Sequence, residues 1–321
     1  MALTLLVLAD PKASWLKLFD SLDAGVTVIV TNDEDHAKDS APKADALLNG
    51  MTTPRLLSVV VPLLTRARWI HSMWAGLDAV WSPELRASTL PLTNGRGVFR
   101  VSLAEWTIGA MLHFSYDMRR MIRQQEARTW EVFTTTELAG KTLGVIGYGA
   151  IGRATAERAK AFGMRVLALR RRPELSEADP FIDENVSIKE INRLMSASDY
   201  VQVAAPLTDE TRGMVGPAQV AAMKPTAVII NVGRGAVIDE SALADALKTN
   251  KIRGAALDVF ALEPLPADHA FWGLPNLLLS PHTADHTPDF VHLGVECFLD
   301  NLRRFRAEEP LLNIVDRQAG Y

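Results

Sequence analysis

Cysteine is almost missing from this chain: Cys297 is the only one among 321 residues. No disulfide can therefore form within the chain, which is typical of proteins from a reducing compartment. Long apolar runs are missing too, because no segment approaches the roughly 20 apolar residues that cross a bilayer. The apolar start, Ala2–Ala9, lacks the basic flank of a signal peptide and is followed by Asp10-Pro11. We therefore expect a cytoplasmic protein that has no membrane partner.

An excess of basic residues is also absent. Lys and Arg together number 34 and Asp and Glu 38, which gives a formal net charge of −4. A protein that coats nucleic acid would need a basic excess, so we expect no nucleic-acid partner. Small anionic substrates stay compatible with this charge, because local charge decides their binding.

The composition, with 48% hydrophobic and 22% charged residues, is that of a soluble globular protein. A length of 321 residues exceeds what one hydrophobic core usually serves, so two domains are expected. Asn94–Gly97 is a turn cluster that can mark the exit from the first domain. Ser102–Glu105 is a capping box that predicts a long helix from Val101 to about Arg128. Another helix, from Phe290 to about Arg306, could return the chain to the first domain.

Short apolar runs alternate with helix-like stretches, and this pattern predicts doubly wound parallel sheets with right-handed crossovers. The second half shows the stronger alternation. The expected strands are Leu3–Ala9, Val26–Val30, Ala44–Leu48, Trp69–Ser72, Leu143–Gly147, Arg165–Leu169, Tyr200–Ala204, Val228–Val232, Ala255–Val259 and Leu277–Ser280.

A glycine-rich segment, Gly147-Tyr148-Gly149-Ala150-Ile151-Gly152, follows one of these apolar runs and precedes a helical stretch, Ala154–Phe162. Gly147 would allow the tight turn, Gly149 would let the backbone approach a pyrophosphate, and Gly152 would let helix pack on strand. The helix N-terminus offers free N–H groups and partial positive charge to phosphates. An ordinary strand-turn-helix is the alternative, but this context favours dinucleotide binding.

A carboxylate is missing where an NAD-dependent enzyme would need one, about 20 residues beyond the fingerprint start. The second strand instead runs into Arg170, Arg171 and Arg172, and Glu174 follows only after a proline. Guanidinium groups bind a 2′-phosphate through charge-assisted hydrogen bonds. We therefore predict NADP(H) over NAD(H). The alternative is that these arginines form a solvated surface run.

Three groups suited to carbonyl chemistry, Arg234, Glu263 and His282, stand near the ends of later apolar runs. A planar guanidinium can chelate a carboxylate, and its positive charge is useful where an oxyanion develops. Imidazole exchanges protons near neutral pH, and a carboxylate beside it stabilises its charged form. Gly233 and Gly235, which flank Arg234, are expected to leave the backbone open for a ligand. The combination points to hydride transfer on a 2-oxo or 2-hydroxy acid.

With these motifs, the chain resembles the D-isomer-specific 2-hydroxyacid dehydrogenase family over nearly its whole length. Several ordered motifs together are far more specific than any one of them. Within the family, the triple arginine and Met73–Asp78 resemble the glyoxylate/hydroxypyruvate reductase A group. The matching segments are Gly147–Gly152, Ala204–Thr208, Asn231–Asp239, Leu257–Pro266 and Ser280–Ala284.

The resemblance implies an α/β fold with two doubly wound parallel-sheet domains, the larger a Rossmann dinucleotide-binding domain. Residues 1–98, completed by 287–321, would bind the substrate, and residues 99–286 would bind NAD(P). Arg234 would pair with the substrate carboxylate and polarise the 2-oxo group. His282 would donate the proton during reduction, and Glu263 would hydrogen-bond its ring. A glutamate partner favours 2-hydroxyacid chemistry over the related formate dehydrogenases, which pair their histidine with glutamine.

Binding residues follow from the same resemblance. The turn of Trp74, Ala75 and Gly76 is similar to the family loop whose backbone amides bind the substrate carboxylate, although a simple turn would look alike. Asp258 is expected near the nicotinamide carboxamide or as a cap on local backbone. The residues expected to bind the cofactor are Gly147, Tyr148, Gly149, Ala150, Ile151, Gly152, Arg170, Arg171, Arg172, Ala205, Pro206, Val232, Gly233 and Asp258.

One departure is Asp285, because many relatives carry glycine after the His-x-Ala segment. Together with His282, His286 and His292 it could be taken for a metal site. Pro288 interrupts the segment, however, and no catalytic-metal motif accompanies it, so we expect no metal.

The expected function is NADPH-dependent reduction of small 2-oxo acids, glyoxylate or hydroxypyruvate first, with hydroxypyruvate giving the D-hydroxy acid. The substrate would enter a cleft between the domains, whose closure excludes water. The family implies a homodimer, in which Trp130 reaches the partner's active site as in some relatives. The alternative function is a dinucleotide-sensing interaction protein, because corepressors of this superfamily retain similar catalytic residues.

Overall fold

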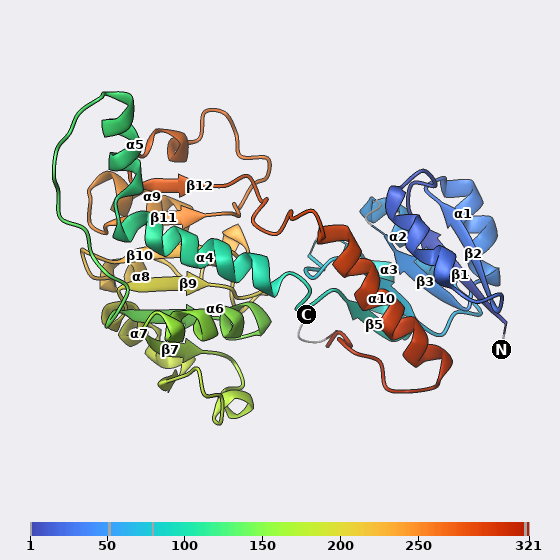
Figure 1. Ribbon diagram of the computed structural model, residues 1–321. Coiled ribbons are helices and arrows are strands. Elements are labelled where there is room, and N and C mark those ends of the chain that lie inside the picture. The colour runs from blue at the N-terminus through green and yellow to red at the C-terminus, as the bar shows by residue number, and fades with distance from the viewer. Residues whose placement is uncertain (1, 51–52, 79, 318–319, 321) are drawn as a thin grey trace. The chain divides into compact units, whose positions relative to one another are not determined.

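The protein folds into two compact units, each a parallel sheet covered by helices (Figure 1). The computed structural model describes residues 2–50, 53–78, 80–317 and 320. Unit 1 comprises Met1–Val98 with Pro288–Tyr321, and unit 2 comprises Phe99–Thr287. No described helix is long and apolar enough to cross a membrane. The expected fold class of two α/β parallel-sheet units is confirmed.

Unit 1 is a five-stranded sheet in the order β2-β1-β3-β4-β5, and every paired strand is parallel to its neighbour. The chain starts in the interior at β1 and winds outward in both directions. Its strands are β1 (Leu3–Leu8), β2 (Val26–Thr31), β3 (Ala46–Asn49), β4 (Ile70–Ser72) and β5 (Leu92–Asn94). Its helices are η1 (Ser14–Ser21), α1 (Glu34–Ser40), α2 (Pro54–Val60), α3 (Pro83–Ala87) and α10 (Phe290–Arg306).

Both faces of this sheet are buried, which explains why β1 reads as one continuous apolar run. Leu6 and Leu8 pack with residues of α1, α2 and α3 on one face. Leu5 and Val7 pack with residues of η1 and α10 on the other.

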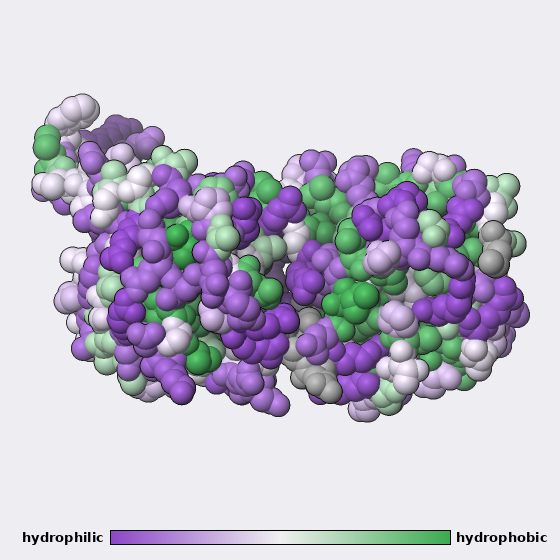
Figure 2. Space-filling model, turned by 90° about the horizontal axis from the view of Figure 1, so that it is seen from below, coloured by the Kyte–Doolittle hydropathy of each residue, from purple (hydrophilic) through white to green (hydrophobic). Residues whose placement is uncertain are grey.

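The molecular surface shown in Figure 2 is dominated by hydrophilic side chains, with hydrophobic ones scattered between them.

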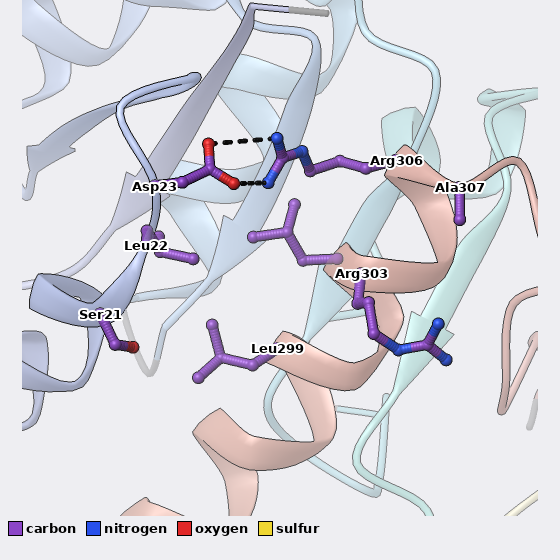
Figure 3. A pocket seen from close by; sticks show the side chains of 8 residues that line it. Ser21, Leu22, Asp23, Leu299, Arg303, Arg306 and Ala307 are labelled. Atoms are coloured by element: carbon purple, nitrogen blue, oxygen red, sulfur yellow. Dashed lines mark hydrogen bonds and ion pairs between the residues drawn. The ribbon is translucent and has the colours of Figure 1, made fainter.

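An ion pair also fastens the C-terminal helix α10 to the N-terminal part of unit 1. The two guanidinium Nη atoms of Arg306 donate to the carboxylate of Asp23 at 2.6 and 3.1 Å. The hydrogen bond from Arg306 lowers the pKa of Asp23. Figure 3 shows this pair at the rim of a pocket between α10 and the segment Ser21–Asp23. The helix thus returns the chain to the first unit, as the sequence indicated.

Unit 2 is a seven-stranded parallel sheet in the order β12-β11-β10-β9-β6-β7-β8. The winding direction reverses between β6 and β9, and doubly wound sheets bind ligands at such a switch point, beyond the carboxyl ends of the strands. The strands are β6 (Thr142–Ile146), β7 (Arg165–Leu169), β8 (Glu184–Val186), β9 (Tyr200–Val203), β10 (Val228–Asn231), β11 (Gly254–Leu257) and β12 (Leu277–Leu279). The helices are α4 (Arg100–Ser115), α5 (Met118–Glu126), α6 (Ala150–Ala161), α7 (Ile191–Ala197), α8 (Pro217–Ala222) and α9 (Glu240–Lys248).

Helices cover this sheet in two groups, α4 with α6 and α7 with α8 and α9 (Figure 1). The second group shares one apolar core with the sheet. A buried amide ties the first group together: Gln202 Nε2 of β9 donates to Thr107 Oγ1 of α4 at 3.1 Å and to Thr155 Oγ1 of α6 at 2.9 Å.

The single long helix expected from Val101 to about Arg128 is wrong. Helix α4 ends at Ser115, and Asp117 takes a left-handed conformation with φ of 51° before α5 begins. Aspartate tolerates this conformation better than most residues. The expected capping box is also wrong, because the helix already starts at Arg100 and Ser102 Oγ donates back to Phe99 O at 3.1 Å.

A histidine in the middle of unit 1, His71 of β4, is completely buried. Its Nδ1 lies 2.7 Å from Thr93 Oγ1, which also accepts a hydrogen bond from Trp69 Nε1 at 2.9 Å. Its Nε2 has no partner among the described residues. Burial lowers the pKa of His71 to about 3, so the ring is neutral in the folded protein.

This pKa shift predicts acid sensitivity of unit 1. The unfolded chain takes up a proton near pH 6.5, whereas the folded chain resists it down to about pH 3. The stability that comes from keeping the His71 ring neutral is therefore complete above pH 6.5 and is lost as the pH falls below this value. In urea titrations followed by tryptophan fluorescence, the free energy of unfolding of the wild-type protein should fall as the pH is lowered. It should fall by up to about 1.4 kcal/mol per pH unit more than that of His71→Gln. Equal slopes for both proteins would contradict this assignment.

Candidate active site

The glycine-rich turn lies at the switch point of unit 2, between β6 and α6. Gly147 has φ of 93°, and a Cβ there would lie 2.5 Å from the amide nitrogen of Ala205, which follows β9. Only glycine fits both conditions. The turn is thus held directly against Ala204 and Ala205, and Ala205 is one of the residues expected to bind the cofactor.

Helix α6 starts at Ala150, earlier than the expected start at Ala154. Gly149 is its N-cap, makes no side-chain capping bond, and has open space where a Cβ would point. A Cβ on Gly152 would lie 2.7 Å from Val145 Cγ1, so this glycine lets the helix pack on β6. The first turn of α6, which includes Ile151, therefore offers its amides to an anion, as a pyrophosphate site requires. The residues present fit a bound dinucleotide.

The three arginines begin where β7 meets this turn. The carbonyl oxygen of Leu169 accepts hydrogen bonds from the amides of Gly147 at 2.9 Å and Tyr148 at 3.1 Å. Arg170 is half-buried, while Arg171 and Arg172 are exposed. The end of β7 therefore continues into three arginines, and none of these three positions carries a carboxylate.

A carboxylate that sequence reasoning missed, Asp179, also lies in this region. Its side chain is 12% exposed, and it pairs with Arg153 of α6 at 2.7 Å. Its other oxygen accepts the amide of Phe181 at 3.1 Å. Burial, reinforced by Asp179, raises the pKa of Tyr148. Asp179 stands in an irregular segment after β7, so no periodicity signals its position, and its charge is already paired.

Three neighbouring strands bring the expected catalytic residues to one edge of unit 2. The last residues of β10, β11 and β12 (Asn231, Leu257 and Leu279) pair in register across the sheet. Arg234, Asp258 and His282 follow these strands directly or after a short turn. The carboxyl ends of parallel strands lie on the same edge, so these three residues share it.

The turn that carries Arg234 is tied by Asn231. The side chain of Asn231 donates to Arg234 O at 3.0 Å and accepts from the amide of Gly233 at 3.0 Å. The expectation that Gly233 and Gly235 leave the backbone open is wrong. A Cβ on Gly233 would lie 2.6 Å from Ala205 O, and one on Gly235 would lie 1.9 Å from Phe260 C. Both glycines instead allow close packing that fixes the Arg234 backbone after Val232.

The side chain of Arg234 is half-buried at the strand edge. Its Nη1 donates to the carbonyl oxygen of Gly233 at 2.8 Å, which orients the guanidinium group. A planar donor held in this way can still present further N–H groups to a carboxylate.

Glu263 and His282 form a hydrogen-bonded pair, with Glu263 Oε2 lying 2.7 Å from His282 Nδ1. The other carboxylate oxygen accepts a hydrogen bond from the amide of Phe260 at 2.8 Å, so both oxygens of Glu263 are engaged. The side chains remain 34% and 41% exposed, respectively, and so are open to a ligand. Because Nδ1 is engaged, Nε2 is the ring atom left to exchange a proton with a bound molecule.

The backbone of His282 is in the left-handed region, with φ of 53°. Such a conformation costs free energy for a non-glycine residue and persists where its surroundings enforce it. Asp258, only 1% exposed, supplies that constraint, because its Oδ1 accepts the amides of Thr283 at 3.0 Å and Ala284 at 3.1 Å. The structure thus places Asp258 as a cap on the His282 turn.

Asp285 puts a carboxyl group on this turn, beyond Ala284. Its side chain is 16% exposed, and its Oδ1 has no hydrogen-bond partner within the described ranges. Burial raises the pKa of Asp285, against the opposing effect of the neighbouring His286 and His282. Across the described residues, no group of three or more His, Cys, Asp or Glu side chains is placed to hold a metal ion.

The turn of Trp74, Ala75 and Gly76 belongs to unit 1 and follows β4. It begins where the amide of Met73 donates to Asn49 O at 3.1 Å. Trp74 is half-buried and Ala75 is exposed, so the turn presents backbone to solvent.

Comparisons with known proteins agree with this arrangement. Residues 108–284 match the family model described as D-isomer specific 2-hydroxyacid dehydrogenase, NAD binding domain. The chain is 32% identical over 283 residues to a glyoxylate reductase of Korarchaeum cryptofilum, covering 85% of this chain and 83% of that protein. It is 33% identical over 259 residues to a glyoxylate/hydroxypyruvate reductase B of Pectobacterium carotovorum, covering 79% of this chain and 80% of that protein.

Solved structures give the same picture. A D-isomer specific 2-hydroxyacid dehydrogenase family protein of Aeromonas salmonicida superposes with a TM-score of 0.83 at 29% identity, covering 99% of this chain and 100% of that chain. An NADPH-dependent glyoxylate/hydroxypyruvate reductase of Sinorhizobium meliloti, solved with NADP and sulfate, gives a TM-score of 0.84 at 25% identity, covering 99% of each chain. These relatives are reductases and dehydrogenases, and nothing in them favours the dinucleotide-sensing alternative. The chain belongs to the D-isomer specific 2-hydroxyacid dehydrogenase family and is an NAD(P)-dependent oxidoreductase.

Proposed function

We propose that this enzyme reduces small 2-oxo acids, glyoxylate and hydroxypyruvate first, to 2-hydroxy acids of D configuration with NADPH. The observation that carries the proposal is the Glu263–His282 pair at 2.7 Å on the strand edge that also holds Arg234. The relatives named glyoxylate reductase and glyoxylate/hydroxypyruvate reductase support this substrate class.

His282 Nε2 would give its proton to the 2-oxo oxygen as negative charge develops there. Glu263 holds the ring by Nδ1 and so fixes its orientation. The guanidinium of Arg234 would bind the substrate carboxylate and polarise the carbonyl group. In unit 1, the backbone amides of the Trp74–Gly76 turn would serve to bind a substrate carboxylate. The nicotinamide cofactor supplies the hydride.

The cofactor would bind along the switch point of unit 2. Its pyrophosphate would meet the glycine turn and the first turn of α6. Ala205, Pro206, Val232 and Gly233 would line the site, and Asp258 would lie near the nicotinamide carboxamide. Arg170, Arg171 and Arg172 would favour the 2′-phosphate of NADPH, because charge-assisted hydrogen bonds suit that group. NADP- and NADPH-bound relatives of this fold support the preference.

An assay of NADPH and NADH oxidation with glyoxylate, hydroxypyruvate, pyruvate and phenylpyruvate tests the function. His282→Asn should lower kcat about 10²–10⁴-fold, because the proton donor is lost. The matched control is His269→Asn, since His269 also faces a glutamate in unit 2, with Nε2 3.9 Å from Glu240. This control should retain nearly full turnover. No oxidation with any of the four acids would overturn the proposal, and normal turnover in His282→Asn would remove His282 from the mechanism.

The cofactor preference predicts a second result. Arg170→Asp should lower kcat/KM for NADPH by about tenfold or more and spare NADH, because a carboxylate repels the 2′-phosphate. Arg165→Asp makes the same charge change at the opposite end of β7 and should leave the NADPH-to-NADH ratio unchanged. A wild-type preference for NADH would contradict the assignment.

We further propose that the enzyme is a homodimer formed through α5 and the loop that follows it. No residue of α5 is buried, and its exposed apolar side chains continue into that loop. In Figure 2 this region projects at the upper left. The exposed apolar residues are Met118, Met121, Ile122, Trp130 and Val132.

The loop is folded onto α5 although it is exposed. Gln124 Nε2 donates to Glu131 O at 3.2 Å, and the guanidinium of Arg120 lies 4.4 Å from the ring centre of Phe133. An exposed projection that carries five apolar side chains is a surface that a second copy of the chain can cover.

The dimer predicts that Ile122→Glu shifts the mass measured by light scattering after gel filtration toward that of a monomer, because a charge would enter the interface. Leu175→Glu is the matched control, since Leu175 is also an exposed apolar residue of unit 2. A monomeric wild-type protein would contradict the proposal.

A further inference from the structure

Three neighbouring strands of unit 1 end in buried polar residues that lie side by side. Asn49, Ser72 and Asn94 are the last residues of β3, β4 and β5, and they pair in register across the sheet. Each is at most 2% exposed. A buried polar group destabilises the fold unless it forms hydrogen bonds, so the partners of the Asn94 side chain indicate what it does.

The side chain of Asn94 reaches the turn that follows β4. Its Nδ2 donates to Ala75 O at 2.8 Å, while its Oδ1 accepts the amide of Arg96 at 3.2 Å. The next residue also contacts this turn, because the amide of Gly95 donates to Trp74 O at 3.2 Å. The end of β5 therefore holds two successive carbonyl groups of the turn.

Glycine is required beside Asn94 for this contact. A Cβ at Gly95 would lie 2.4 Å from Met73 O and 3.6 Å from the amide nitrogen of Ala75. Any side chain there would push the turn away from β5 and break the hydrogen bonds to its carbonyls.

Holding the carbonyls also fixes the amides. In a planar trans peptide the N–H points opposite to the C=O of the same unit. With Trp74 O and Ala75 O directed at β5, the N–H groups of Ala75 and Gly76 point away from it. Neither amide donates to an acceptor within the described part of the chain. Two adjacent free N–H groups that point the same way can bind a carboxylate.

We propose that Asn94 is a positioning residue that aims the amides of Ala75 and Gly76 at the carboxylate of the 2-oxo acid. The inference rests on the proposed function and adds to it a residue of unit 1 that does not touch the substrate. Loss of the Asn94 amide frees Ala75 O, so the turn no longer presents both N–H groups together. Substrate binding weakens, whereas cofactor binding, which belongs to unit 2, does not.

The test compares KM for hydroxypyruvate and for NADPH in Asn94→Ala and Asn94→Ser. Serine can still accept the Arg96 amide but is too short to reach Ala75 O. Both variants should raise KM for hydroxypyruvate by about tenfold or more and change KM for NADPH less than about twofold. The inhibition constant of oxalate, a dicarboxylate that is not reduced, should rise in parallel.

Asn313→Ala is the matched control. Asn313 Nδ2 donates to Asn94 O at 3.2 Å and to Arg96 O at 2.9 Å. It therefore supports the end of β5 that carries Asn94, but it does not contact Ala75. If the effect were general loosening of unit 1, this control would raise KM for hydroxypyruvate as much as the Asn94 variants do. Thermal unfolding of all variants establishes that unit 1 remains folded at the assay temperature.

The outcomes separate the two claims. An active wild-type enzyme with unchanged hydroxypyruvate KM and oxalate inhibition in both Asn94 variants would overturn the role of Asn94 alone. An equal rise in Asn313→Ala would overturn it as well. A wild-type protein that reduces none of the 2-oxo acids would overturn the proposed function, and the role of Asn94 with it.

Discussion

The structure depends on one topological constraint: the paired strands within each sheet are all parallel. A chain that adds a parallel strand must first cross the face of the sheet, so the loops after the strands gather on one edge. This is why Gly147, Arg234, Asp258 and His282, far apart in the sequence, all belong to the same edge of unit 2. The Asn49–Ser72–Asn94 row of unit 1 follows from the same constraint.

Much of the fold was predictable because buried parallel strands leave continuous apolar runs. Ten runs were expected as strands, and all ten correspond to strands of the structure, with ends shifted by a few residues. The strands β5 (Leu92–Asn94) and β8 (Glu184–Val186) were missed, because each contains only one apolar residue and so forms no apolar run. The break at Asp117 was missed because the helical periodicity continues across it, and only the backbone conformation reveals it.

The candidate site was predictable as a set of residues but not as a set of contacts. The sequence indicated Glu263 and His282, and the structure pairs them. The bond from Asp258 to the His282 turn joins two different strand ends, so no local pattern could show it. The glycines beside Arg234 were misinterpreted for a related reason. A glycine signals close approach, but the sequence does not say whether a ligand or another stretch of backbone approaches.

The interrupted course of unit 1 has a consequence during synthesis. Residues 99–287 leave the ribosome as one continuous stretch, so unit 2 can complete its core while translation continues. The five-stranded sheet must wait for α10, which supplies Val295, Phe298 and Leu302 to one of its faces. Until then Leu5, Val7 and Trp69 lack their cover. The part of unit 1 that is made before unit 2 is thus completed only after unit 2 has been made.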